Sequence, residues 1–178
     1  MSSASLIIIT GLPGTGKTTI ATALSERISA AHFNTDMLRT ELGLRGQYDQ
    51  ETKAQVYAVL LDRARDTLRG GNTVIIDGTF YQAKLRYRFK QLATSEGISV
   101  HWIELWADTE VIRTRVSKKR AYSEANFDVY QKIKAMYEPI QDPHLHLRSK
   151  DTNLEYLIEE ILSYLDSEQK NKGALPKA

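Results

Sequence analysis

An eight-residue segment near the N-terminus has the composition of a loop that wraps around a phosphate group. The pattern Gly-x4-Gly-Lys-Ser/Thr is matched by Gly11-Leu12-Pro13-Gly14-Thr15-Gly16-Lys17-Thr18. Glycines allow positive φ angles, so the backbone can turn its N–H groups toward a phosphate, and the following helix adds a partial positive charge. In such loops the lysine reaches the β- and γ-phosphates, and the hydroxyl is a ligand of Mg²⁺. The segment therefore predicts a site for a nucleoside triphosphate with magnesium.

Nucleotide contacts are expected along this loop and one residue beyond it. The predicted nucleotide-binding residues are Gly11, Pro13, Gly14, Thr15, Gly16, Lys17, Thr18 and Thr19. Lys17 is also a predicted catalytic residue, and Thr18 is the predicted metal ligand. The guanine-reading motif Asn-Lys-x-Asp is absent, because no acid follows Asn171-Lys172-Gly173 at the required position. ATP is therefore the expected nucleotide.

Two further patterns bear on the fate of the γ-phosphate. The chain lacks the Leu-Ser-Gly-Gly signature of transporter ATPases, and Gly78 follows Asp77 where many motor ATPases have a water-activating glutamate. These patterns disfavour a hydrolytic engine and favour a kinase, which holds an acceptor beside the nucleotide. An ATP-binding regulatory protein with little turnover is the alternative of a different class.

The candidate general base is Asp36, directly after the strand predicted at 32–35. Ligands of parallel α/β sheets bind at the carboxyl ends of the strands, so this carboxylate is expected at the same edge as the phosphate loop. It could accept the proton of an attacking hydroxyl group. Arg39 follows one helical turn later, and both side chains could face one acceptor. The competing role of Asp36 is to cap the next helix.

A second acidic residue, Asp77, ends the apolar strand predicted at 73–77 on the same edge. Its carboxylate could hold Mg²⁺ through water or bind the acceptor. The alternative is that Asp77 caps the helix that follows Gly78-Thr79-Phe80.

Basic residues are concentrated between Arg113 and Arg120, where a predicted helix ends. Phosphoryl transfer requires cations that neutralise the developing charge, and these cations are often delivered by a mobile lid. Arg115 and Arg120 are the candidate catalytic cations, on a lid expected at about 115–125. The alternative is a solvated helix end whose cations favour the helix dipole.

These residues lie at the junctions of alternating strands and helices. Apolar, β-rich runs predict strands at 6–10, 32–35, 73–77, 99–105 and 144–148. Helical patterns are present at 17–29, 37–42, 51–69, 83–95, 109–118, 124–137 and 154–167. Ser123 is a candidate cap for the sixth of these helices. The alternation predicts an α/β fold with a parallel sheet covered by helices on both faces.

The 178 residues suit one domain, predicted at 1–168, followed by a disordered tail at 169–178. The net charge of +2 is smaller than the contribution of the three tail lysines, so charge alone does not indicate a nucleic-acid partner. The absence of cysteine excludes disulfides and thiolate metal sites. Without a signal-peptide pattern or a membrane-spanning apolar run, a cytoplasmic protein with no membrane partner is expected. No sequence feature indicates an oligomeric state.

Over about residues 5–165 the chain resembles the small P-loop kinases of the polynucleotide-kinase-like and zeta-toxin-like group. The resemblance is carried by Gly11–Thr18, Asn34–Arg39, Val74–Phe80 and Arg115–Ala125. It implies a three-layer P-loop NTPase fold, with a five-stranded parallel sheet of order 2-3-1-4-5 and a short helical lid. It also implies that Asp36 is the general base. Arg39 would contact the acceptor, and Arg115 and Arg120 would hold the phosphates.

Members of this group phosphorylate polynucleotide 5′-hydroxyls, sugars, antibiotics and nucleotide-sugars. One feature favours a nucleic-acid 5′ end as the hydroxyl-bearing acceptor: the predicted helix 83–95 contains Lys84, Arg86, Arg88 and Lys90. Tyr81 and Tyr87 lie nearby and could stack on a base. The competing interpretation is a solvated basic surface and a small-molecule acceptor held by Asp36, Arg39 and Asp77.

Overall fold

Five parallel strands form the central sheet of the computed structural model, which describes residues 4–118, 123, 125–149 and 153–173. The strands are β1 (Ser5–Gly11), β2 (Ala31–Asn34), β3 (Val74–Asp77), β4 (Ser99–Trp106) and β5 (Leu145–Arg148). They lie in the order β2-β3-β1-β4-β5, and every neighbouring pair is parallel. The predicted strand order is therefore confirmed.

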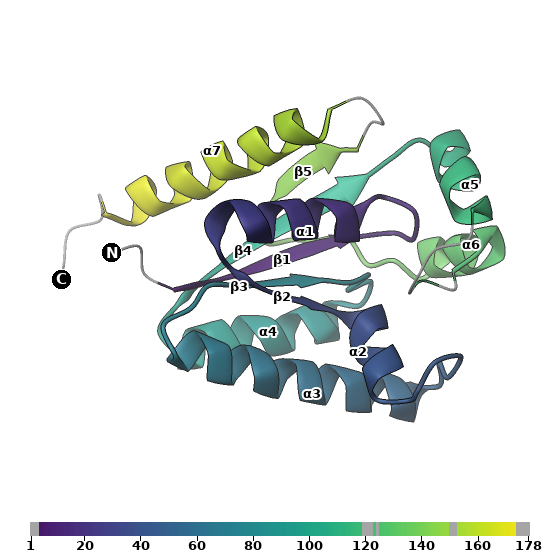
Figure 1. The fold of residues 1–178 in the computed structure, drawn as a ribbon, viewed down its shortest axis with the longest axis horizontal. Coiled ribbons are helices and arrows are strands. Elements are labelled where there is room, and N and C mark those ends of the chain that lie inside the picture. Colours follow the sequence, from purple (N-terminus) through teal and green to yellow (C-terminus); the bar gives the residue numbers. More distant parts are fainter. Residues whose placement is uncertain (1–3, 119–122, 124, 150–152, 174–178) are drawn as a thin grey trace.

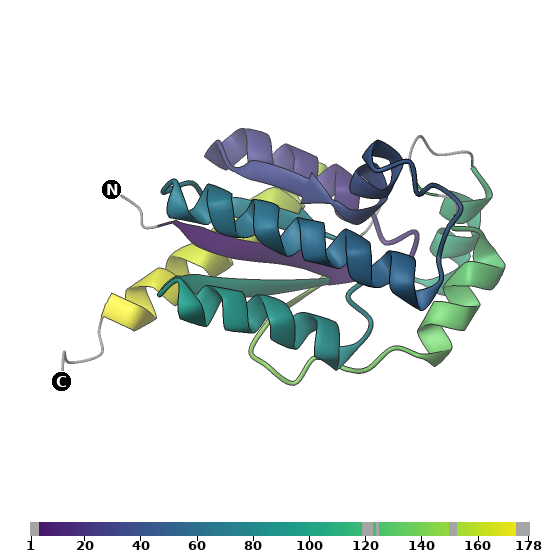
Figure 2. The same cartoon turned by 90° about the horizontal axis from the view of Figure 1, so that it is seen from below.

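Helices cover both faces of the sheet and give the molecule three layers (Figure 1). One face is covered by α1 (Lys17–Ile28) and α7 (Leu154–Gly173). The opposite face is covered by α3 (Gln50–Arg69) and α4 (Ala83–Ser95), which lie in front of the sheet in Figure 2. Three shorter helices lie toward the end to which the strands point: α2 (Thr35–Glu41), α5 (Thr109–Ser117) and α6 (Phe127–Ala135). The predicted three-layer α/β fold is confirmed.

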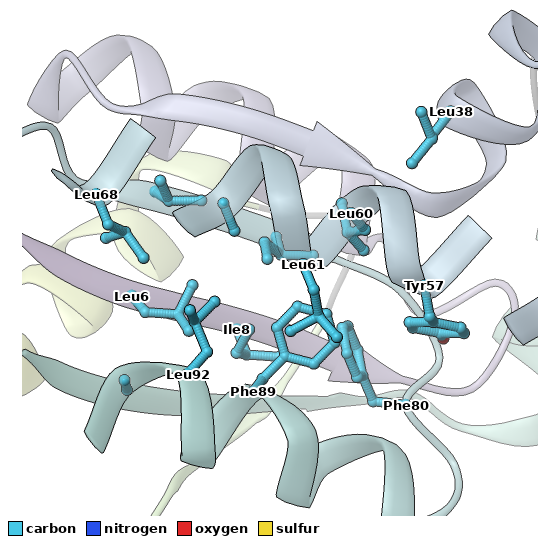
Figure 3. Close-up of a cluster of buried hydrophobic side chains, with 14 of the residues drawn as sticks. Leu6, Ile8, Leu38, Tyr57, Leu60, Leu61, Leu68, Phe80, Phe89 and Leu92 are labelled. Carbon is cyan, nitrogen blue, oxygen red and sulfur yellow. The ribbon is translucent and has the colours of Figure 1, made fainter. Parts of the chain in front are cut away.

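Alternating side chains of β1 supply two hydrophobic clusters, one on each face of the sheet. Leu6 and Ile8 belong to the cluster that includes α3 and α4, whereas Ile7 and Ile9 pack with α1 and α7. Figure 3 shows the first cluster, in which the Phe80 and Phe89 rings meet edge to face with centroids 5.2 Å apart. Because β1 is buried on both faces, the loop that leaves its carboxyl end starts from a rigid position.

Two helix boundaries differ from the predicted ones by three residues or more. The last helix continues beyond 167 to Gly173, so the first part of the predicted tail is helical, and residues 174–178 lie outside the described residues. The sixth helix begins at Phe127 rather than at 124, because its N-cap is Asn126 and not Ser123. The Asn126 side chain accepts a hydrogen bond from the Val129 N–H at 3.0 Å. Ser and Asn are both good caps, so residue type alone does not choose between them.

Within the ranges that the structure describes, none of the helices has both the length and the apolar character needed to cross a lipid bilayer.

Candidate active site

The phosphate loop connects β1 to α1 at the carboxyl edge of the sheet. Its glycines have positive φ angles of 142° at Gly11, 85° at Gly14 and 87° at Gly16. A Cβ at Gly11 would lie 2.3 Å from the Leu105 carbonyl oxygen, and one at Gly14 would lie 2.9 Å from Val116 Cγ1. At Gly16 the nearest atoms would be 3.9 Å away, so only the backbone conformation favours glycine there. Close packing thus adds a second requirement for glycine at Gly11 and Gly14.

Lys17 lies across the loop that precedes it. Its ammonium group donates to the carbonyl oxygen of Leu12 at 3.0 Å, and the Thr15 hydroxyl donates to the same oxygen at 2.8 Å. These bonds hold the Lys17 side chain over the turn whose N–H groups are expected to surround the phosphates.

A polar cluster joins the first turn of α1 to the ends of β2 and β3. The Asp77 side chain is fully buried, and Thr18 Oγ1 donates to its Oδ2 atom at 2.7 Å. Asn34 Nδ2 donates to Asp77 Oδ1 at 2.7 Å, and His32 Nε2 lies 2.9 Å from the same oxygen. Both carboxylate oxygens are therefore paired, as burial of a polar group requires. Asp77 does not cap α4, whose N-cap is Gln82, so that alternative is excluded.

The Thr18 hydroxyl retains the bonding capacity that a metal ligand needs. Its proton points to Asp77, and one of its two lone pairs accepts from Asn34 Nδ2 at 3.2 Å, which leaves the second lone pair. Mg²⁺ prefers oxygen ligands and usually combines one or two carboxylates with waters and substrate phosphates. The oxygens of Thr18 and Asp77 therefore fit Mg²⁺ bound together with a nucleotide.

His32 and Asn34 are not among the predicted site residues. They are two positions apart on β2, so their side chains share one face of the strand, and Asn34 is paired in register with Asp77. Polar side chains at alternate positions of a strand that ends near an acidic strand end are the signal that could have identified them.

Asp36 lies in the first turn of α2, but it is not the cap of that helix. The N-cap is Asn34, whose Oδ1 atom accepts from the Met37 N–H at 2.7 Å. The alternative that Asp36 serves as the N-cap is therefore excluded.

Arg39 is buried and is held by the segment that follows α2. Its Nη1 atom donates to the Gln47 carbonyl oxygen at 2.6 Å, and its guanidinium carbon lies 4.6 Å from the centroid of the Tyr48 ring. Burial raises the pKa of Tyr57, the charge of Asp36 raises it further, and the charge of Arg39 lowers it. Asp36 and Arg39 are three residues apart on α2, a spacing that places both side chains on one side of the helix.

On the opposite side of the loop, α5 packs against the glycine turn. Arg115 Nη1 donates to the Gly14 carbonyl oxygen at 3.2 Å and to the Ser149 hydroxyl at 2.8 Å. Arg115 therefore contacts the phosphate loop directly. The other predicted lid cation, Arg120, lies outside the described residues, as do 119–122 and 124 of the predicted lid.

The remaining predicted nucleotide contacts lie on either side of Lys17. Pro13 is buried within the loop, whereas Thr18 and Thr19 are exposed on the first turn of α1. A hollow beside them is lined by Thr18, Thr19, Thr22, Ala23, Glu26 and Leu154. This hollow lies between α1 and the start of α7, next to the loop.

Helix α4 is not the open cationic surface that its sequence predicts. Arg86 is buried, and its guanidinium donates to the carbonyl oxygens of Phe80, Glu138 and Pro139. Lys90 is paired with Asp142, and the Tyr81 ring is 9% exposed. Lys84, Tyr87 and Arg88 remain exposed. Half of the basic residues and one of the two rings thus have partners within the protein, which removes much of the sequence argument for a nucleic-acid acceptor.

Residues 6–140 of the chain match the family described as AAA domain. An uncharacterized protein of Mycobacterium tuberculosis is 29% identical over 123 residues, which are 62% of this chain and 25% of that protein. The chain thus spans about a quarter of the length of the first curated relatives that it matches. A probable adenylyl-sulfate kinase of Aeropyrum pernix is 26% identical over 166 residues, which cover 89% of this chain and 90% of the relative.

Several solved structures share the fold. A sugar kinase from Janibacter is 24% identical, with a TM-score of 0.69 over 92% of this chain and 95% of that one. The Mycobacterium tuberculosis APS kinase in complex with AMPPNP and APS is 18% identical, with a TM-score of 0.73 over 93% and 99%. A chain of the Pnkp1/Rnl/Hen1 RNA repair complex is 16% identical, with a TM-score of 0.66 over 76% and 44%. At these identities the likeness concerns the fold alone.

Proposed function

The chain belongs to the family described as AAA domain, its relatives support a kinase at the general level, and from this premise we propose that it transfers the γ-phosphate of ATP to a hydroxyl group of an acceptor. One observation carries the proposal: the Asp77 cluster joins Thr18 of the phosphate loop to the residue that caps the Asp36 helix. A phosphate site and a candidate base therefore share one edge of the sheet. Gly78 in place of a water-activating glutamate supports transfer to an acceptor over hydrolysis.

The donor half of the proposed site consists of the loop N–H groups, Lys17 and Thr18. Lys17 would contact the β- and γ-phosphates, and Thr18 and, through water, Asp77 would hold Mg²⁺. When bound, Mg²⁺ supplies positive charge at the phosphate oxygens. Arg115 contacts the loop at Gly14 and is the proposed lid cation. The proposed catalytic unit is residues 1–168, with the lid at about 115–125.

In the proposed reaction Asp36 removes the proton of the acceptor hydroxyl. The acceptor oxygen forms a bond to the γ-phosphorus, and the bond from that phosphorus to the bridging oxygen of ADP breaks. Arg39, on the same side of α2, would orient the acceptor. Arg39 also contacts Gln47 and Tyr48, so the 47–48 segment would form part of the proposed acceptor wall.

The geometry favours a small hydroxyl-bearing molecule over a polynucleotide. Proteins bind nucleic-acid ends with exposed cations and exposed aromatic rings. In this protein Arg86 and Tyr81 are buried, and Lys90 is paired with Asp142. The polynucleotide 5′-hydroxyl is the competing acceptor, and the likeness of fold to a chain of an RNA repair complex makes it worth including in the test.

The test is a screen for transfer of labelled γ-phosphate from ATP. Acceptors to be compared are sugars, nucleosides, aminoglycosides and 5′-hydroxyl oligonucleotides, each at low salt and with Mg²⁺. The Asp36→Asn variant identifies labelling that depends on the proposed base. Asp62→Asn, a change at an exposed carboxylate of α3, is the matched control.

Labelling of a small hydroxyl compound that is lost in Asp36→Asn and kept in Asp62→Asn is the expected outcome. Labelling of oligonucleotides alone would show that the acceptor is a polynucleotide and not a small molecule. Tight ATP binding without labelling of any acceptor would contradict the kinase and favour a regulatory nucleotide-binding protein.

A further inference from the structure

One buried side chain touches both halves of the proposed site. Asn34, the last residue of β2, is 7% exposed. Its Oδ1 atom accepts from the Met37 N–H at 2.7 Å and thereby caps α2, two residues before Asp36. Its Nδ2 atom donates to Asp77 at 2.7 Å and to the Thr18 hydroxyl at 3.2 Å.

The orientation of the Asn34 amide is fixed by the chemistry of its partners. A backbone N–H can only donate, so the Met37 side requires the amide oxygen. The Asp77 carboxylate accepts, so the opposite side requires the amide nitrogen. Turning the amide over would break the bonds to Met37 and Asp77 in a buried place, where unpaired polar groups are costly. The side chain therefore acts as a rigid link between Thr18–Asp77 and α2.

We propose that Asn34 is a positioning residue that couples occupancy of the nucleotide side to the placement of the Asp36 helix. This inference rests on the proposed function. Engagement of Thr18 and Asp77 by a nucleotide with Mg²⁺ restrains the Asn34 amide, and the amide restrains the first turn of α2 through its cap. The candidate base is thereby ordered when the phosphoryl donor is in position.

His32 offers a matched contrast, because it contacts the same Asp77 oxygen as Asn34 but caps no helix. Removal of His32 takes one partner from Asp77 and leaves the link to α2 in place. Asn34→Ser also takes one partner from Asp77, but it breaks the link as well, since serine is a good N-cap that lacks the amide donor. The two variants therefore separate support of Asp77 from coupling to α2.

Hydrogen–deuterium exchange with the ATP analogue AMPPNP and Mg²⁺ tests the coupling without turnover. In the wild type, exchange should slow both in loop 11–18 and in α2. In Asn34→Ser the loop should still slow, whereas the slowing of α2 should be reduced roughly tenfold, the size of one hydrogen bond to a charged group. In His32→Ala the α2 response should persist. On an identified acceptor, Asn34→Ser should lower kcat roughly tenfold and leave the KM for ATP within about twofold.

An α2 response that is equal in the wild type and Asn34→Ser would overturn the coupling, as would protection of the wild-type loop with no change in α2. In both cases nucleotide binding would stand, and the proposed function would be left to the labelled-phosphate screen. The absence of any protection of loop 11–18 in the wild type would instead remove the nucleotide site and the inference together. The wild-type experiment can overturn the coupling even if Asn34→Ser fails to fold.

Discussion

The two halves of the proposed site share one edge of the sheet but are built in different ways. The donor half is a run of consecutive residues whose main chain has a conformation fixed by glycines and by packing on Leu105 and α5. The acceptor half is assembled from side chains of separate elements: Asp36 and Arg39 of α2, the 47–48 segment, and Tyr57 of α3.

This difference explains what each half reveals in a sequence. A main-chain site needs glycines, a lysine and a hydroxyl at set spacings, and these spacings identify its ligand. A side-chain site depends on which distant residues meet, so its ligand is encoded in the packing of α2, α3 and the segment between them. The donor is therefore identified by a short motif, and the acceptor is not.

The largest effect is expected in the donor half. Lys17→Ala should lower the transfer rate by about a hundredfold to a thousandfold, because it removes a cation aimed at the phosphates. Lys84→Ala, at an exposed cation of α4, should leave the rate within about twofold. Rates measured with labelled ATP check both changes, and a similar loss in both variants would mean that the loop is not the donor site.

The next largest effect is a difference in stability between variants of a buried and an exposed arginine of α4. Arg86→Ala should lower the free energy of unfolding by about 3 kcal/mol, since three carbonyl oxygens lose their donor, whereas Arg88→Ala should change it by less than about 0.5 kcal/mol. Urea unfolding measures both values. If Arg88→Ala weakens oligonucleotide binding and reduces its salt dependence, the exposed residues of α4 would form a nucleic-acid-binding surface after all.

Within the donor half, the glycines should differ in how much they support the fold. Gly11→Ala should destabilise by about 2–3 kcal/mol, because its Cβ would meet the Leu105 carbonyl oxygen at 2.3 Å. Gly16→Ala should cost only about 1–2 kcal/mol, from its positive φ angle. Thermal unfolding of both variants is the check, and equal losses would show that packing around the loop adds nothing to the requirement for glycine.

The smallest effect concerns the acceptor half at alkaline pH. Burial first, and the charge of Asp36 second, raise the pKa of Tyr57 above its usual value. A raised pKa contributes stability that is complete below the unfolded value of about 10 and is lost as pH rises above it, by about 1.4 kcal/mol per unit. Tyr57→Phe should therefore lose less stability than the wild type between about pH 10 and 11. Identical pH profiles would contradict the burial of this hydroxyl.

Much of the fold could be predicted because it rests on local patterns. The run Leu6 to Ile9 indicates a strand covered on both faces, and the alternation of such strands with helices predicts a parallel sheet. The strand order followed from the resemblance to P-loop kinases. The boundary of α6 was missed because Ser123 and Asn126 are equally good caps, and tertiary context chose between them.

Less of the candidate site could be predicted, because its side chains have uses that no spacing indicates. Arg86 resembles a surface cation in the sequence, yet it binds carbonyl oxygens inside the protein. Asn34 takes the capping role that Asp36 could have had, and His32 of β2 contacts Asp77 of the neighbouring strand β3. Such roles depend on which chain segments meet in three dimensions.

The most direct test of the phosphotransferase account compares nucleotide binding and phosphoryl transfer in Asp36→Asn. The measurement uses the acceptor found by the labelled-ATP screen, with Glu41→Gln, at the other end of α2, as the control. We expect transfer by Asp36→Asn to fall at least about a hundredfold, the contribution of a general base, while the affinity for AMPPNP with Mg²⁺ stays within about twofold. Unchanged transfer by Asp36→Asn would contradict the account, because the donor half would then act without the proposed base.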